Sequence, residues 1–176
     1  MKTKYEIILA LNKAYDEFCN YIIDLNEEQF LNEPHNKWSL GQHTAHLIKS
    51  ISPVVLAFKI PKTILKLFFA KPNREGRTYS ELIKKYNLKL TEGGKASGRF
   101  NIKQKIMFYK KDMLLRRLLK NKRNLCKLIE RKKENELDTL LLPHPLLGKL
   151  TLREMLYFTI YHAEHHLKIV QNEPYI

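Results

Sequence analysis

The chain has 176 residues, 44% of them hydrophobic, with 7 Pro and 6 Gly, so it is long enough for a sizeable core and its composition excludes a disordered chain. Its 32 Lys and Arg outnumber its 18 Asp and Glu by 14, which gives a formal net charge of +14. Such a surface attracts nucleic acid, acidic lipid or a small anionic substrate, and charge alone does not choose among them.

The N-terminal segment is predicted to form a helix over about residues 3–31. Apolar side chains recur there at the spacing of one helix face, at Ile7, Leu11, Ala14, Tyr15, Phe18, Ile22 and Leu25. Polar residues at positions 12, 13 and 16 interrupt this run too early for the core of a signal peptide. The cysteines Cys19 and Cys126 form no C-x-x-C motif, which fits reduced thiols, so we expect a cytoplasmic protein.

A second helix is predicted over residues 39–58, after the polar break NEPHNKWS. Ser39 and Gln42 have the S-x-x-Q form of a capping box, which satisfies free backbone amides at a helix start. The apolar segment that starts at residue 52 is interrupted by Pro53 and Pro61 and carries lysines at 59, 62 and 66, so no membrane span is expected. One short helix is predicted from Pro61, a second over YSELIKKYNLKL, and a glycine-bearing loop over TEGGKASGRF.

A third long helix, rich in Lys and Arg, is predicted over roughly residues 103–134. Its inner apolar stripe consists of Met107, Leu114, Leu118, Leu125 and Ile129. The segment LPHPLLGKL is expected to be extended. The last helix opens with Thr151 and Glu154 as a second capping box, and Leu150 and Met155 are placed as a hydrophobic staple.

These elements predict an all-α fold. No strand pattern of period two is convincing, and the long amphipathic helices favour a four-helix bundle with short extra helices in the connection between helices 2 and 3. We expect residues 1–176 to form a single domain.

The last helix carries three histidines within MLYFTIYHAEHHLKIVQ. On a helical projection His162 lies in the apolar sector, and His166 lies about 40° from it, one turn away. His165 falls at the border with the polar face. A single core histidine is commonly satisfied by hydrogen bonds, whereas an i, i+4 pair on one face is also the spacing at which two helical histidines hold one metal ion. Periodicity leaves both interpretations open.

The second helix offers a third metal ligand from either of two histidines. His43 and His46 lie three positions apart, so both can approach the same face. His43 lies nearer the centre of the apolar sector and His46 lies at its edge, so the pattern slightly favours His43.

Two segments, KWSLGQHTAHLIKS and HPLLGKLTLREMLYFTIYHAEHHLKIVQ, resemble the DinB family, and the resemblance covers most of the chain. It implies a four-helix bundle that holds a divalent metal through one histidine of the second helix and an H-x-x-x-H pair of the last. Matched by position, the metal ligands are His46, His162 and His166. This match overrides the preference for His43, and it leaves His43 and His165 as candidates for supporting roles.

Three imidazoles suit Zn²⁺ or Ni²⁺ and leave a coordination position open for water or substrate. The resemblance therefore implies a metal-dependent enzyme, either a hydrolase or a transferase that activates a small anionic thiol such as bacillithiol or mycothiol. The sequence offers no obvious general base. Glu164 faces the polar side of its helix, and Glu33 and His35 belong to a loop that is expected to be solvated. Trp38 is expected to be a packing anchor or, alternatively, a substrate wall.

The basic run KKDMLLRRLLKNKRNLCKLIERKK suggests an alternative function. Lys and Arg bind phosphates, so the chain would then be a non-enzymatic module with a vestigial metal site that holds nucleic acid or a protein. The run has few interleaved aromatics and no nucleic-acid fold signature, which favours a solvated helix face. We therefore expect a small-molecule substrate and neither a nucleic-acid nor a membrane partner, with a homodimer left open.

Overall fold

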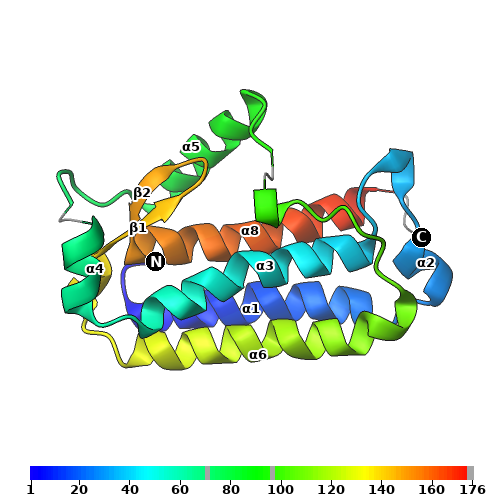
Figure 1. Ribbon diagram of the computed structural model, residues 1–176, viewed down its shortest axis with the longest axis horizontal. Helices are drawn as coiled ribbons and strands as arrows, with labels where there is room; N and C mark the ends of the chain where they lie inside the picture. Colours follow the sequence, from blue (N-terminus) through cyan, green and yellow to red (C-terminus); the bar gives the residue numbers. More distant parts are fainter. Residues whose placement is uncertain (70–71, 96–97, 174–176) are drawn as a thin grey trace.

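The computed structural model describes residues 1–69, 72–95 and 98–173, and it is mostly helical. The longest described helices are α1 (Lys4–Ile23), α3 (Leu40–Lys59), α6 (Lys111–Glu130) and α8 (Leu152–Asn172). They lie side by side in Figure 1, where α1 and α3 each pack against both α6 and α8. The helical character predicted from the sequence is therefore confirmed.

The two helices for which the sequence predicted a capping box, α3 and α8, begin where predicted. At the start of α3, Ser39 N–H donates to Gln42 Oε1 at 2.8 Å and Gln42 N–H donates to Ser39 Oγ at 3.4 Å. At the start of α8, Thr151 and Glu154 make the same reciprocal pair at 2.8 and 3.1 Å. The two caps fix the first residue of each helix, and therefore they fix which residues of α3 and α8 face one another.

The first helix is shorter than predicted. α1 ends at Ile23, and a separate helix, α2, covers Glu27–Leu31. Asn26 explains the break, because its side chain accepts a hydrogen bond from Gln29 N–H at 2.9 Å and starts a new helix. A 3₁₀ turn, η1 (Pro34–Asn36), then leads into α3.

The third long helix also begins later than predicted, because residues 103–107 are not helical and a 3₁₀ turn, η3 (Phe108–Lys110), precedes α6. The chain crosses the start of α3 here: Gln42 Nε2 donates to the Ile102 carbonyl, and Ile106 packs so closely on Gly41 that an added Cβ would lie 2.8 Å from it. Met107 is 48% exposed, so its assignment to the inner stripe was wrong. The other four residues of that stripe are buried: Leu114, Leu118, Leu125 and Ile129.

The connection between α3 and α6 contains the two predicted short helices, α4 (Lys62–Phe69) and α5 (Tyr79–Thr91), followed by a 3₁₀ turn, η2 (Gly98–Phe100). The glycine-bearing loop lies between α5 and η2, and its residues 96 and 97 lie outside the described residues. After α6 comes another short helix, α7 (Glu134–Thr139).

The expectation of a fold without strands was wrong in one place. β1 (Leu141–His144) and β2 (Gly148–Thr151) form an antiparallel hairpin in which Leu142 is paired with Leu150. His144 closes its turn, because Nδ1 accepts from the N–H groups of Leu146 and Leu147 at 3.2 and 3.1 Å. Strands of four residues, one of them interrupted by a proline, are too short to show a period of two.

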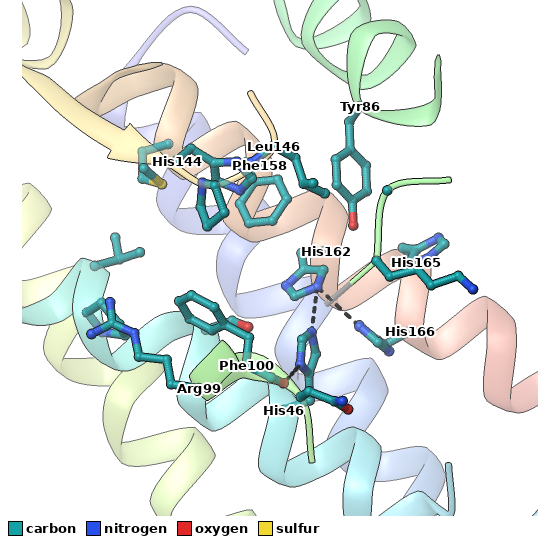
Figure 2. A pocket seen from close by; sticks show the side chains of 18 of the residues that line it. His46, Tyr86, Arg99, Phe100, His144, Leu146, Phe158, His162, His165 and His166 are labelled. Carbon is teal, nitrogen blue, oxygen red and sulfur yellow. Dashed lines mark hydrogen bonds between the residues drawn. The ribbon is translucent and has the colours of Figure 1, made fainter. Parts of the chain in front are cut away.

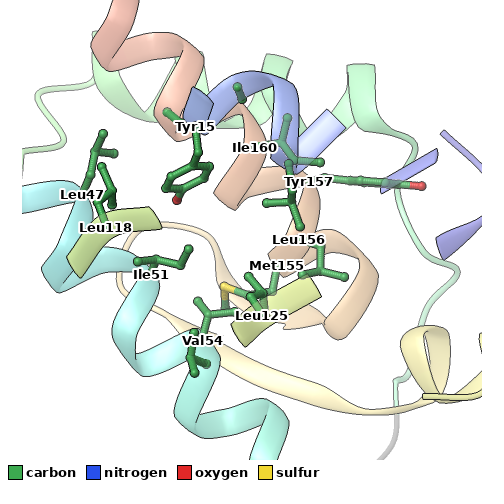
Figure 3. Packing of buried hydrophobic residues seen from close by; sticks show 14 of the residues in the cluster. Tyr15, Leu47, Ile51, Val54, Leu118, Leu125, Met155, Leu156, Tyr157 and Ile160 are labelled. Carbon is green, nitrogen blue, oxygen red and sulfur yellow. The ribbon is translucent and has the colours of Figure 1, made fainter. Parts of the chain in front are cut away.

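The hydrophobic core lies between the four long helices (Figure 3). Tyr15 from α1, Leu47 and Ile51 from α3, Leu118 and Leu125 from α6, and Leu156 and Ile160 from α8 are at most 1% exposed. Within the described residues, no helix combines the length and apolarity needed to cross a membrane.

Candidate metal centre

Three histidines from two helices converge between α3 and α8 (Figure 2). His162 Nε2 lies 3.1 Å from His46 Nε2 and 3.1 Å from His166 Nε2. His162 and His166 are one turn apart on α8, so both rings point toward α3. Each of the three residues is 5% exposed, and one ligand atom from each lies within 4.8 Å of the others. The structure thus brings together the three residues that the resemblance implied.

The spacing of these nitrogens fits a divalent ion. With metal–nitrogen bonds of about 2.0–2.1 Å, the nitrogens of a tetrahedral site lie about 3.3 Å apart, close to the 3.1 Å that separates His162 Nε2 from each of the other two nitrogens. Hydrogen bonding alone serves the cluster poorly. A ring nitrogen carries at most one hydrogen, and His162 Nε2 faces two other ring nitrogens at once. An ion that accepts a lone pair from each ring resolves this conflict.

The backbone of η2 sets the orientation of His46. His46 Nδ1 lies 2.8 Å from the carbonyl oxygen of Phe100. A carbonyl only accepts, so Nδ1 carries the hydrogen, and in the neutral ring Nε2 then holds a free lone pair. That lone pair is directed at the other two histidines, which is the arrangement that metal-binding histidines commonly show.

His43 lies beside the cluster and supports it. Its Nδ1 is 2.8 Å from Nδ1 of His166, on the side of that ring opposite the cluster. When His166 Nδ1 donates to His43, Nε2 of His166 is left as a lone pair. Periodicity favoured His43 over His46 as the inward-facing partner, but the structure brings His46 to the cluster.

Burial keeps the three rings of the cluster neutral. It lowers the pKa of His162 and of His166 well below the ordinary value, and neighbouring imidazoles add to the effect. Burial also lowers the pKa of His46, although the hydrogen bond to Phe100 acts in the opposite direction. Neutral imidazole is the form that binds metal, so near pH 7 no proton has to leave these rings first.

The other polar residues that the sequence singled out are not part of the three-histidine cluster, although the ring of His165 lies 5.5 Å from that of His166 and lines the cavity. The ring of His165 packs edge-on against Tyr86, with its centroid 6.1 Å away. Glu164 accepts a hydrogen bond from the Tyr79 hydroxyl at 2.8 Å. Glu33 pairs with Lys105, and His35 is exposed in η1. Among the described residues, none of these carboxylates reaches the three nitrogens.

Aromatic rings wall the cluster on two sides. Trp38 lies over His46, with ring centroids 4.9 Å apart, and is stacked nearly parallel to His166 at 6.4 Å. Phe158 is stacked on His162 at 4.9 Å. Trp38 is therefore a wall of the site as well as a packing residue, and Phe158 is a second wall that sequence analysis missed.

The cluster opens into a cavity of about 990 Å³, at the upper end of the range for small-molecule sites. Several of its lining residues were not recognised from the sequence: Tyr86, Arg99, Phe100, His144 and Phe158. Tyr86, Leu146 and Phe158 gather on one side of the histidines, and Phe100 lies beside His46 (Figure 2). Arg99 and Phe100 belong to η2 and His144 belongs to the β-hairpin, where no helical periodicity marks a buried face, whereas Tyr86 and Phe158 lie on α5 and α8.

The family model of the DinB superfamily matches residues 10–170. The chain belongs to the DinB superfamily. The match includes α3 and α6, most of α1 and α8, and all three histidines of the cluster, so the resemblance found in the sequence is confirmed. A search of curated proteins gives no match.

A solved structure with a similar fold is the colibactin self-resistance protein ClbS in complex with a double-stranded DNA. The likeness has a TM-score of 0.54 and 21% sequence identity, and it covers 98% of this chain and 97% of that chain. At this identity the likeness shows the fold alone. It still corrects one expectation: nucleic acid was not expected as a partner, yet a chain with a similar fold is bound to double-stranded DNA, so the fold gives no reason to exclude it.

Proposed function

We propose that this protein is a metal-dependent enzyme whose divalent ion is held by His46, His162 and His166. The observation that carries the proposal is the convergence of three buried, neutral imidazoles at the wall of a large cavity. Zn²⁺ and Ni²⁺ are the ions that such a nitrogen set favours. We further propose that the four long helices form a DinB-type four-helix bundle, that the whole chain is one such domain, and that it works in the cytoplasm.

The proposed chemistry is the activation of a small thiol for transfer to an electrophile. When bound, the ion lowers the pKa of a thiol or water in its open position, so that the nucleophile reacts as an anion. Phe100 and His43 hold two of the ligand rings in their metal-binding tautomers. Trp38 packs on the ring of His46 and Phe158 on that of His162, so these aromatic rings help to hold the ligand rings in place. Hydrolysis of a substrate by activated water is the other reaction that this site supports.

Positive charge near the cavity supports an anionic thiol. Lys95 and Arg99 line the cavity, as does Lys37, whose charge is paired with Glu173, and the described lining residues include no Asp or Glu. A thiol that carries a carboxylate would therefore meet a favourable potential as it approaches.

An assay of thiol consumption tests this proposal. Protein loaded with Zn²⁺ or Ni²⁺ is incubated with bacillithiol or cysteine and 1-chloro-2,4-dinitrobenzene, and the loss of free thiol is followed. We expect turnover by the wild type and by His165→Ala, and none by His162→Ala. A wild type that binds metal but accelerates neither thiol transfer nor ester hydrolysis would overturn the enzymatic proposal.

A second candidate function is DNA binding by the exposed face of α6. Five basic residues of α6 are exposed, namely Arg116, Arg117, Lys120, Arg123 and Lys127. α6 packs on α1 and α3 and lies on the far side of the molecule from α5, which roofs the cavity (Figure 1). ClbS, which has a similar fold, is bound to double-stranded DNA. A basic face away from the cavity would bind phosphates independently of the metal.

A further inference from the structure

The cavity is elongated and has two chemically different ends. It is lined on α3 by residues from His43 to Ala57 and on α8 by residues from Met155 to Ile169. The ends of each span are 14 positions apart, which corresponds to about 21 Å along a helix. The two helices run in opposite directions (Figure 1), so the cavity extends from the three histidines toward the start of α8 and the β-hairpin.

The end away from the histidines is apolar. It is lined by Val54 and Ala57 of α3, Met155 of α8, and Leu142 and Leu146 of the hairpin. These five side chains offer no hydrogen-bond donor or acceptor to a ligand, and His144 of the hairpin, which also lines the cavity, already accepts through Nδ1 from the turn amides of Leu146 and Leu147. Burial of apolar surface is therefore the main favourable term at this end. A small polar thiol leaves this end unfilled.

The histidine end requires an anion once an ion is bound. Three imidazole ligands bring no negative charge to balance a divalent cation, and the described residues that line the cavity include no carboxylate. Lys95 and Arg99 add further positive charge at the lining, whereas Lys37 is already paired with Glu173. An apolar cavity with this excess charge favours a ligand that brings a negative group of its own.

We infer that the substrate of this site is an elongated amphipathic anion, with a carboxylate or similar acidic head at the histidines and an alkyl or aryl body in the apolar end of the cavity. The position of the head rests on the proposed metal function. The position of the body rests on the cavity walls alone.

Calorimetric titration of the full chain with simple carboxylates tests this inference. Zn²⁺-loaded and metal-free protein are each titrated with hexanoate, octanoate, decanoate and 1-octanol. A buried methylene strengthens binding up to about fourfold, so decanoate should bind about tenfold or more tightly than hexanoate in both forms of the protein. Octanoate should bind more tightly than 1-octanol to the loaded protein, and this preference should shrink without metal.

Two variants locate the body in the apolar end. Ala57→Trp fills that end, so it should abolish the advantage of decanoate while leaving hexanoate and Zn²⁺ binding unchanged. Leu146→Asp places a charge in the same wall from the hairpin and should weaken decanoate about tenfold, provided that its circular dichroism matches the wild type. Leu67→Trp is the matched control, because Leu67 is 82% exposed on α4 and does not line the cavity.

The outcomes separate this inference from the proposed function. Equal affinity for the three carboxylates, or a decanoate affinity that neither Ala57→Trp nor Leu146→Asp changes, would overturn the inferred substrate class while Zn²⁺ binding stands. Chain-length dependence in a protein that binds no Zn²⁺ or Ni²⁺ would support the apolar body and overturn the proposed metal function.

Discussion

The Nε2 atoms of His46 and His162 lie 3.1 Å apart, although 116 positions separate the two residues in the sequence. The capped start of α3 and the capped start of α8 fix this approach, since each sets which residues of its helix face the other. At this distance the two nitrogens direct lone pairs at one another, with no carboxylate between them. This arrangement is costly unless a proton or a cation lies between the two nitrogens.

Metal should therefore stabilise the fold. An ion that binds only the folded state adds about 2.7 kcal/mol to the free energy of unfolding at a hundredfold excess over its Kd. We expect the Tm to rise on addition of Zn²⁺ or Ni²⁺ at pH 7.5, measured by differential scanning calorimetry. His166→Ala should lose most of this gain, since the ion then keeps two ligands, and His165→Ala should keep it. Identical, metal-independent melting curves for all three proteins would mean that these are core histidines satisfied by hydrogen bonds.

Acid should destabilise the metal-free protein well above the range in which carboxylates titrate. Burial lowers the pKa of His144 to about 4, whereas an unfolded histidine titrates near 6.5. Between these two values the unfolded chain binds more protons than the folded chain, so the free energy of unfolding falls as the pH falls. The contribution of His144 is fully present above about pH 6.5 and is lost progressively toward pH 4.

Urea unfolding between pH 7.5 and 5 checks this expectation. His144→Asn removes the titrating group but keeps an acceptor for the turn amides of Leu146 and Leu147, so its stability should depend less steeply on pH. His35→Asn is the control for the substitution itself, because His35 is exposed in η1 and lies outside the hairpin. Equal slopes for wild type and His144→Asn would contradict the argument.

Helical periodicity placed the two histidines of α8, His162 and His166, on one face, whereas His46 of α3 was chosen only on the family resemblance. His162 and His166 share the apolar stripe of one helix, so an i, i+4 pattern is enough to place them together. His46 lies at the edge of the α3 stripe because α3 has two buried faces. One packs on α6 and is buried in the core through residues such as Leu47, and the other faces the cavity. A single-stripe projection cannot separate these two faces.

The walls of the cavity were beyond prediction for a different reason. Phe100, His144 and Leu146 belong to a 3₁₀ turn and a short hairpin, whose positions depend on contacts far away in sequence. Local periodicity carries no information about such contacts. The helix starts, by contrast, were predictable because a capping box is closed by residues only three positions apart.

Glu154 should be essential for stability. Its carboxylate is fully buried and accepts a two-pronged contact from Arg74 at 2.7 and 2.8 Å, while Arg77 N–H donates to it at 2.9 Å. Glu154→Gln leaves both guanidinium groups without their anion and should lower the free energy of unfolding by about 3 kcal/mol. Glu81→Gln alters the matched capping-box position of α5, where the carboxylate is exposed, and should cost much less. Equal losses in guanidinium chloride titrations would show that only the helix cap matters.

DNA binding by α6, the second candidate function, should show itself in salt dependence. Each phosphate that a basic side chain neutralises adds about 0.9 to the slope of log affinity against log salt, so a face with several exposed Arg and Lys gives a steep line. Fluorescence anisotropy with a labelled duplex of about 20 base pairs measures this slope.

Reversing Arg116 and Arg117 to Glu should weaken binding at every salt concentration and lower the slope by about 2. Reversing Lys84 and Lys103, which are exposed outside α6, changes the net charge equally and should have a much smaller effect. His162→Ala should bind DNA as the wild type does. If both charge reversals weakened binding to the same extent, the +14 charge of the whole chain would be responsible, and α6 would not be a DNA-binding face.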